Sequence, residues 1–211
     1  MKKVFDERNA SADELWEYYM LEYKSTNAIS RYLYDRFFST IKKIIDSLEP
    51  DIKILEVGCG PGESSRRIMS FLKTQHFEAS EYDPRLVRKL NELNPEFNVI
   101  EESVYEMKRE DNSFDLVIML EVLEHLDEIE KALSELFRVS NKYVLLSVPM
   151  EPLWRILNLI RFKYVKAFGN TPGHINHFTP NKLKKLISKF GKVLLLKKPY
   201  PWLLCLAEKY K

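Results

Sequence analysis

The residues best suited to chemistry form a glycine-rich loop that follows a short apolar segment. Residues 52–57 lead into the run Gly58-Cys59-Gly60-Pro61-Gly62, in which glycines stand at alternate positions. Residues without a Cβ let the backbone turn tightly and approach a bound molecule closely. A strand that leads through such a loop into a helix commonly binds a nucleotide-like ligand. The loop therefore predicts a binding site of this kind.

The glycine spacing distinguishes between classes of ligand. A dinucleotide fingerprint needs a third glycine three residues after the second, and Glu63 stands at that place. A glutamate there would repel a pyrophosphate, and no Gly-Lys-Ser/Thr follows to form a P-loop. S-adenosylmethionine has no phosphate but carries an amino group and a sulfonium cation. An acidic glycine-rich loop suits that ligand better.

A second acidic residue supports this interpretation. Glu81 ends the next apolar segment, residues 76–82, about 20 residues after the loop, where an acid accepts hydrogen bonds from both ribose hydroxyls. Asp83 is the alternative, but it precedes Pro84 and suits the N-cap of a helix. Glu81 is therefore the predicted ribose-binding acid.

Four ordered segments together resemble the motifs of class I S-adenosylmethionine-dependent methyltransferases, particularly the small-molecule branch with enzymes of ubiquinone and menaquinone biosynthesis. The segments are residues 56–62, Glu81, residues 102–107 with 111–117, and residues 121–126, and the resemblance spans roughly residues 50–150. It implies S-adenosylmethionine as cofactor and S-adenosylhomocysteine as product. The implied cofactor-binding residues are Glu56, Gly58, Cys59, Gly60, Gly62, Glu81, Tyr82, Ser103, Val104, Leu120 and Glu121.

One position departs from the family pattern. The family often has an aspartate after the third strand that binds the adenine amino group, and Ser103 stands there. Its hydroxyl can accept the same hydrogen bond, and the backbone N–H of Val104 can donate to the ring. We expect adenine recognition to persist with a weaker contact.

Three histidines are the candidates for catalysis. His125 follows the fourth strand, and His174 and His177 lie in a Gly/Pro-rich stretch where this family commonly forms its acceptor side. Imidazole titrates near neutrality and suits a general base. A structural role in an irregular loop is the alternative. No third Cys, His or acidic cluster accompanies the pair, so no metal site is predicted.

The remaining pattern indicates how these residues are positioned. Strands and helices alternate over most of residues 49–211, which predicts a Rossmann-like, seven-stranded, mostly parallel sheet with helices on both faces and an antiparallel last strand. Ligands of such sheets bind at the carboxyl ends of the strands. Residues 1–48 are predicted to be helices that cover the active site, and residues 150–180 a lid inserted in the methyltransferase domain.

Composition limits the partners and the compartment. The chain has 33 Lys and Arg against 31 Asp and Glu, a net charge of +2, which gives no strong signal for nucleic-acid binding. Two cysteines far apart, no signal-peptide pattern and no apolar run of membrane-spanning length favour the cytoplasm. Residues 153–166 mix apolar and basic side chains, which fits a lid or a helix that touches a membrane.

These observations favour the transfer of a methyl group to a small-molecule acceptor by in-line displacement from the sulfonium. An apolar acceptor is compatible with them. No Asn/Asp-Pro-Pro-aromatic motif follows the fourth strand, and no cysteine stands where RNA cytosine-C5 enzymes place a nucleophile. A protein or tRNA acceptor is the second hypothesis, and a non-catalytic cofactor-binding protein is the third. The sequence specifies neither the acceptor nor the oligomeric state.

Overall fold

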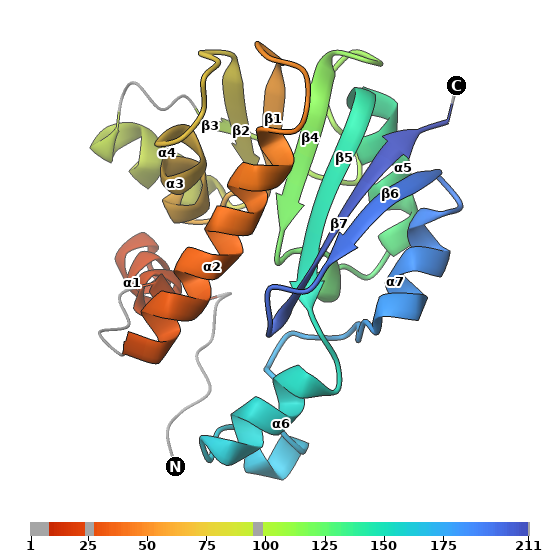
Figure 1. Ribbon diagram of the computed structural model, residues 1–211. Coiled ribbons are helices and arrows are strands. Elements are labelled where there is room, and N and C mark those ends of the chain that lie inside the picture. The colour runs from red at the N-terminus through yellow and green to blue at the C-terminus, as the bar shows by residue number, and fades with distance from the viewer. Residues whose placement is uncertain (1–8, 24–27, 95–98, 211) are drawn as a thin grey trace.

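The computed structural model describes residues 9–23, 28–94 and 99–210, and a seven-stranded sheet forms its centre (Figure 1). The strand order is β3-β2-β1-β4-β5-β7-β6. All neighbouring pairs from β3 to β5 are parallel, and β7 runs antiparallel to both β5 and β6. The strands are β1 (Ile54–Val57), β2 (Phe77–Glu81), β3 (Val99–Glu101), β4 (Phe114–Leu120), β5 (Ser140–Pro149), β6 (Gly191–Lys197) and β7 (Trp202–Lys209). The predicted fold class is confirmed, including the antiparallel last strand.

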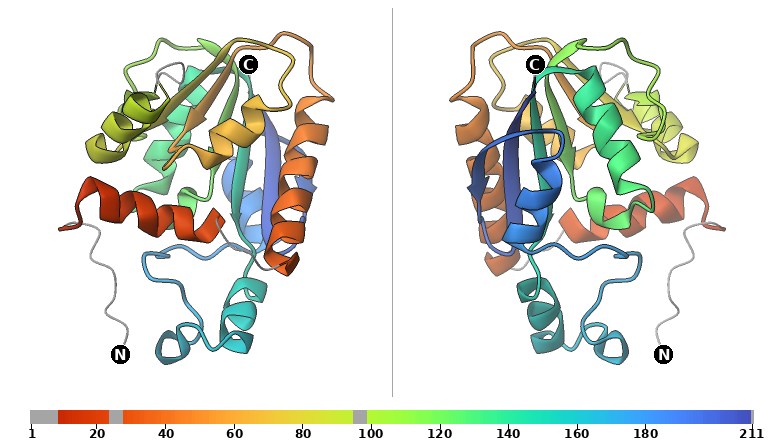
Figure 2. Two further views of the ribbon diagram at one scale, coloured as in Figure 1. Left: turned by 90° about the vertical axis from the view of Figure 1, so that its left-hand side faces the viewer. Right: turned by 90° about the vertical axis from the view of Figure 1, so that its right-hand side faces the viewer.

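Helices cover both faces of the sheet, which separates two apolar cores. One face carries α2 (Ala28–Ile45), α3 (Glu63–Met69) and α4 (Pro84–Leu93), and the other carries α5 (Ile129–Val139) and α7 (Pro180–Ile187) (Figure 2). Strand β4 shows why the sheet is buried on both sides. Its Leu116 and Ile118 pack in the core under α2, and its Val117 and Met119 pack in the core under α5. Its continuous apolar sequence is typical of such a central strand.

Local signals in the sequence place the helix that follows β2. Asp83 is the N-cap of α4, and its side chain accepts a hydrogen bond from the backbone N–H of Arg85 at 2.9 Å. Pro84 occupies the first helical position, where its missing N–H has no helical partner to lose. The predicted N-cap role of Asp83 is confirmed.

Two helices lie beyond the carboxyl ends of the parallel strands. Helix α1 (Ala12–Tyr23) crosses under the sheet next to α4, and α6 (Leu153–Ile160) projects from the same edge (Figures 1 and 2). Helix α2 instead runs along one face of the sheet, where Phe37 and Ile41 are buried in the core. Residues 1–8 and 24–27 of the predicted N-terminal cover lie outside the described residues. A cover of residues 1–48 therefore stays a prediction.

No helix in the described residues combines the length and the apolar composition that a bilayer crossing requires.

Candidate functional site

The glycine loop is packed on one side and open on the other. Gly58 and Gly60 have φ angles of 74° and 53°, in the left-handed region that glycine tolerates. A Cβ at Gly58 would lie 2.7 Å from the Cγ2 of Val122, which follows β4, whereas a Cβ at Gly60 would meet no heavy atom within 4 Å. The backbone N–H groups of Gly58 and Cys59 both donate to the carbonyl of Ser80, at 2.8 and 3.0 Å. The loop is therefore fixed between two strand ends, with open space at Gly60.

Glu81 reaches this loop from the end of β2. Its Oε2 accepts a hydrogen bond from the backbone N–H of Gly60 at 2.8 Å, and its Oε1 accepts one from that of Asp83 at 2.9 Å. Burial raises the pKa of the Glu81 carboxyl above its ordinary value, against the lowering effect of these hydrogen bonds. Because a carboxylate has about four acceptor positions, it can also accept ribose hydroxyls.

Glu56, at the base of the loop, is a buried carboxylate that is only partly satisfied. Its Oε2 accepts a hydrogen bond from the Ser65 hydroxyl, and its Oε1 has no hydrogen-bond partner among the described residues. Burial raises the pKa of this carboxyl, and the hydroxyls of Ser64 and Ser65 oppose that effect. A buried acceptor without a donor is costly. The amino group of S-adenosylmethionine would supply a donor to this unpartnered oxygen. Glu56 and Glu81 together therefore fit the cofactor.

Glu121 stands where β4 ends and the chain turns. Its φ of 56° is in the left-handed region, which is uncommon for a residue with a side chain. The Ser147 hydroxyl of β5 donates to Glu121 Oε1 at 2.7 Å and accepts from its backbone N–H at 3.0 Å. The neighbouring strand therefore holds this carboxylate at the carboxyl edge of the sheet.

The other predicted cofactor residues differ in exposure. Leu120 and Val104 are buried, whereas the Tyr82 residue is 73% exposed. Ser103 is partly buried, and its hydroxyl accepts a hydrogen bond from the Tyr105 backbone N–H at 3.3 Å.

Cys59 lies inside the loop but is not suited to covalent chemistry. It is buried, and burial raises the pKa of its thiol well above the ordinary value, so the thiolate is not formed near neutral pH.

The fold brings His125 and His174 together. His125 belongs to η1 (Leu123–His125), and its Nδ1 lies 3.0 Å from the carbonyl oxygen of Gly173. The rings of His125 and His174 are perpendicular, with centroids 4.9 Å apart, and His174 also stacks on Trp154 of α6. Burial lowers the pKa of His174 to about 3, so its imidazole is neutral at physiological pH.

This histidine pair lies at the same edge of the sheet as the glycine loop. Val122, which limits the space at Gly58, is followed directly by η1 and its His125. His177 lies farther along the loop that precedes α7, where its Nε2 is 2.8 Å from Asn170 Oδ1. The three histidines predicted from the sequence thus lie at the carboxyl edge, with His125 in η1 and His174 and His177 in the loop that precedes α7.

Sequence reasoning missed Glu124. This residue is buried, and its Oε1 lies 4.0 Å from His125 Nε2. Its backbone carbonyl accepts hydrogen bonds from the N–H groups of Ile175 and Asn176, both at 3.0 Å, which ties η1 to the histidine loop. The signal in the sequence was its place next to His125, but neighbouring helical residues do not normally face each other, so the sequence did not predict that the two side chains approach.

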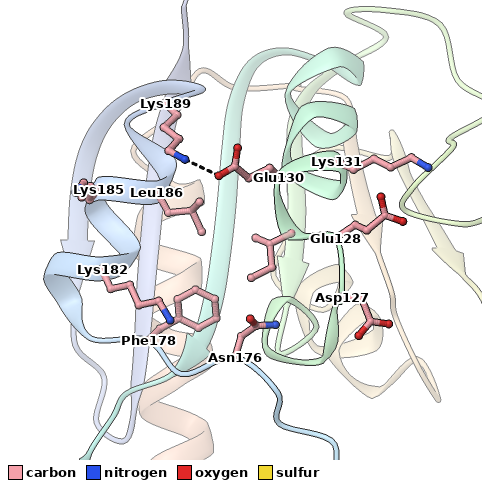
Figure 3. Close-up of a pocket in the computed structure, with 11 residues that line it drawn as sticks. Asp127, Glu128, Glu130, Lys131, Asn176, Phe178, Lys182, Lys185, Leu186 and Lys189 are labelled. Atoms are coloured by element: carbon pink, nitrogen blue, oxygen red, sulfur yellow. Dashed lines mark hydrogen bonds and ion pairs between the residues drawn. The ribbon is translucent and has the colours of Figure 1, made fainter.

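A separate groove lies between α5 and α7, with a volume of about 580 Å³ (Figure 3). Ile129, Phe178 and Leu186 contribute apolar side chains to its lining, and Lys189 forms an ion pair with Glu130 across it (Figure 3). None of the predicted site residues lines this groove. It is therefore distinct from the glycine-loop site.

Comparison with known proteins supports the same ligand class. A family model described as a methyltransferase domain matches residues 29–195. The sterol 24-C-methyltransferase of Aspergillus fumigatus is 29% identical over 97 residues, which cover 44% of this chain and 26% of that protein. The enzyme of the same name from Yarrowia lipolytica is also 29% identical over 97 residues, with the same coverage. The chain spans about a quarter of the length of these curated relatives.

Solved structures share the fold. The magnesium protoporphyrin IX methyltransferase of Synechocystis, with bound S-adenosylhomocysteine, superposes with a TM-score of 0.66 at 16% identity, over 92% of this chain and 94% of that one. An S-adenosylmethionine-dependent methyltransferase from Thermotoga maritima, a possible histamine N-methyltransferase, has a TM-score of 0.61 at 18% identity, over 93% and 99%. The chain therefore belongs to the family described as a methyltransferase domain, and its fold is that of S-adenosylmethionine-dependent methyltransferases.

Proposed function

We propose that this chain transfers the methyl group of S-adenosylmethionine to a small, apolar acceptor. The observation that carries the cofactor assignment is the pair of acids at the glycine loop: Glu81 bonded to Gly60, and Glu56 with a buried oxygen that has no partner among the described residues. Such a site favours a ligand that presents hydroxyls and a positively charged amine.

The elements around the carboxyl edge support an apolar acceptor. Helix α6 brings Trp154 against His174, and the Trp154 indole N–H donates to the Thr171 hydroxyl at 2.9 Å. Helix α1 adds Trp16, which packs against a buried cluster that contains Val87 and Leu90 of α4. Aromatic walls with a few polar groups are typical of small-molecule pockets. The resemblance to the ubiquinone and menaquinone branch, and relatives named for sterol and protoporphyrin methylation, point to the same acceptor class.

Methyl transfer from a sulfonium requires the protein mainly to align the acceptor with the methyl group. The sulfonium is a good leaving group, so an acceptor held in line with the methyl can react without a covalent enzyme intermediate. An acceptor hydroxyl must also lose its proton. His174 is a poor base near neutrality because its pKa lies at about 3. His125, whose side chain is 44% exposed, is better placed to reach an acceptor.

The segment around α6 also suggests where the acceptor is found. Phe162 and Phe168 are 88% and 79% exposed. Ile160, at the end of α6, and Val165, at the start of η2 (Val165–Ala167), are exposed as well. The neighbouring basic side chains, also exposed, are Arg161, Lys163 and Lys166. Apolar tips among basic residues favour contact with an anionic lipid surface. We infer that this segment touches a membrane and receives an apolar acceptor from it.

A labelling experiment tests the proposal. The chain is incubated with methyl-labelled S-adenosylmethionine and, separately, with a lipid extract, an aqueous metabolite pool, tRNA and a protein extract. We expect label in a lipid-soluble small molecule, and much less of it with Glu81→Ala at the same low cofactor concentration. Label confined to tRNA or protein would contradict the proposed acceptor class. Cofactor binding without transfer to any fraction would indicate a binding protein.

A further inference from the structure

We propose that Glu124, His125 and His174 form a binding site for a divalent transition-metal ion at the carboxyl edge of the sheet. Each of these residues offers a ligand atom, and these atoms all lie within 4.8 Å of one another. The sequence offered His174 and His177 without a further ligand beside them, and the fold instead brings Glu124 and His125 to His174. Two imidazole nitrogens and one carboxylate form a donor set that suits Zn²⁺, Mn²⁺ or Co²⁺.

The orientation of His125 is that of a metal ligand. Because the Gly173 carbonyl can only accept, the Nδ1 that lies 3.0 Å from it must carry a proton and donate. Nε2 is then the nitrogen with a lone pair to offer, and it is the nitrogen that lies 4.0 Å from Glu124 Oε1. Metal-binding histidines almost always donate their second ring N–H to a carbonyl, a carboxylate or water in this way.

The two chain segments that carry the ligands are locked together before any ion binds. The Glu124 carbonyl accepts from Ile175 and Asn176, and the Asn176 side chain donates to the Leu126 carbonyl at 2.7 Å. Asn170 donates to the His174 carbonyl at 3.2 Å. Rigid backbones on both sides leave only side-chain rotation for closure. Metal–ligand bonds of about 2.1 Å require ligand atoms about 3.4 Å apart in a tetrahedral site, so closure needs movements on the order of 1 Å.

Two of the proposed ligands are buried and the third is partly exposed, as expected of a metal site that is open to solvent on one side. Glu124 and His174 are buried, at 1% and 8% exposure, and the His125 side chain is 44% exposed. His174 is held between His125 and Trp154. Three protein ligands leave at least one position for water or a substrate oxygen. The exposed side of the site is the side from which an acceptor would enter.

A catalytic role for the ion rests on the proposed function. An acceptor hydroxyl bound to the ion would lose its proton to solvent water more readily, as metal-bound water does. The acceptor oxygen would then form a bond to the methyl carbon while the sulfur–methyl bond breaks, which leaves neutral S-adenosylhomocysteine. The site would thus select acceptors that present an oxygen.

Metal binding can be measured without methyl transfer. The full chain, freed of metal with a chelator, is titrated with Co²⁺ while its visible absorption is recorded, and with Zn²⁺ in a calorimeter. We expect one ion per chain and absorption bands typical of cobalt bound by nitrogen and oxygen. His125→Ala should weaken the binding of Co²⁺ and Zn²⁺ by tenfold to a hundredfold. Because the His125 side chain is partly exposed, we expect this variant to keep the fold, which thermal unfolding verifies.

Two matched controls remove other imidazoles. His177→Ala changes the same loop outside the cluster, and His76→Ala changes an exposed histidine before β2; both should bind Co²⁺ as the wild type does. Glu124→Gln should weaken binding as His125→Ala does. Equal cobalt affinity in the wild type and His125→Ala, or equal losses in all variants, would overturn the proposal. S-adenosylhomocysteine binding by the same samples tests the proposed function separately.

Discussion

Glu81 accepts a hydrogen bond from the backbone N–H of Gly60 at 2.8 Å, which joins the end of β2 to the loop that follows β1. The acid assigned to the ribose is therefore also part of the scaffold that shapes the glycine loop. Its second oxygen is bonded to the N–H of Asp83, the residue that caps α4. One carboxylate thus orders both strand ends before the cofactor arrives.

Replacing Glu81 should weaken cofactor binding. Glu81→Ala removes the charged acceptor for the ribose hydroxyls, and we expect a loss of about 1.5–3 kcal/mol, or roughly ten- to hundredfold in the affinity for S-adenosylhomocysteine. Calorimetry measures this directly. Glu92→Ala, an exposed acid on the outside of α4, is the control and should bind normally. An unchanged affinity in Glu81→Ala would mean that another residue binds the ribose.

Cofactor affinity should depend on pH through Glu81. Burial raises the pKa of this carboxyl above 4.5, so it takes up a proton at a higher pH than an exposed glutamate does. The protonated form is a poorer acceptor for ribose hydroxyls, and affinity should therefore fall as the pH is lowered from neutral toward that raised pKa. Binding isotherms measured across this range, for the wild type and Glu81→Gln, should converge at low pH. Parallel pH profiles for the two proteins would speak against this assignment.

Replacing Glu56 should increase stability and reduce cofactor binding. Its pKa is raised in the folded state, so above the unfolded value of about 4.5 the folded state binds more protons than the unfolded state. Ionising this carboxyl therefore reduces stability as the pH rises. Glu56→Gln removes that cost, and we expect about 1 kcal/mol of added stability at pH 7, or a Tm higher by about 2–4 °C.

Thermal unfolding of Glu56→Gln at pH 4 and pH 7 checks the sign, since the gain should be largest at the higher pH. The same variant should bind S-adenosylhomocysteine more weakly than the wild type. A variant that is less stable at pH 7 would show that the carboxylate is well compensated in the folded protein.

Alanine at Gly58 and at Gly60 should have different effects. Both glycines have positive φ, so either substitution brings backbone strain of about 1 kcal/mol. Only at Gly58 does the added Cβ also clash, 2.7 Å from Val122 Cγ2. Gly58→Ala should therefore unfold at a lower temperature than Gly60→Ala, and Val122→Ala should partly rescue Gly58→Ala. Equal melting temperatures for the two glycine variants would contradict this account.

The exposed apolar segment should bind lipid vesicles. Phe162→Asp and Phe168→Asp remove the two most exposed aromatic side chains beside α6, and we expect a severalfold loss of sedimentation with vesicles that contain anionic lipid. Leu93→Asp, which alters an exposed apolar residue at the end of α4, is the matched control. If the wild type does not sediment with anionic vesicles, the inferred membrane contact is wrong.

The fold class could be predicted from the sequence alone, and the sequence also pointed to the residues of the proposed cofactor site. Strand–helix alternation defined the sheet, because the period of apolar residues is a local property. The glycine spacing, Asp83-Pro84 and the position of Glu81 could be interpreted for the same reason. Each depends on a few neighbouring residues and on the rule that parallel strands end at one edge.

The contacts between side chains from distant segments of the chain could be known only from the folded structure. Glu124 and His125 lie on one short turn, and His174 reaches them from a loop that follows β5 and α6. Glu121 is fixed by Ser147 of the neighbouring strand, and Gly58 is limited by Val122. These pairings follow from the order of strands in the sheet and from the packing of irregular segments, and neither is encoded in the spacing of residues along one strand or helix.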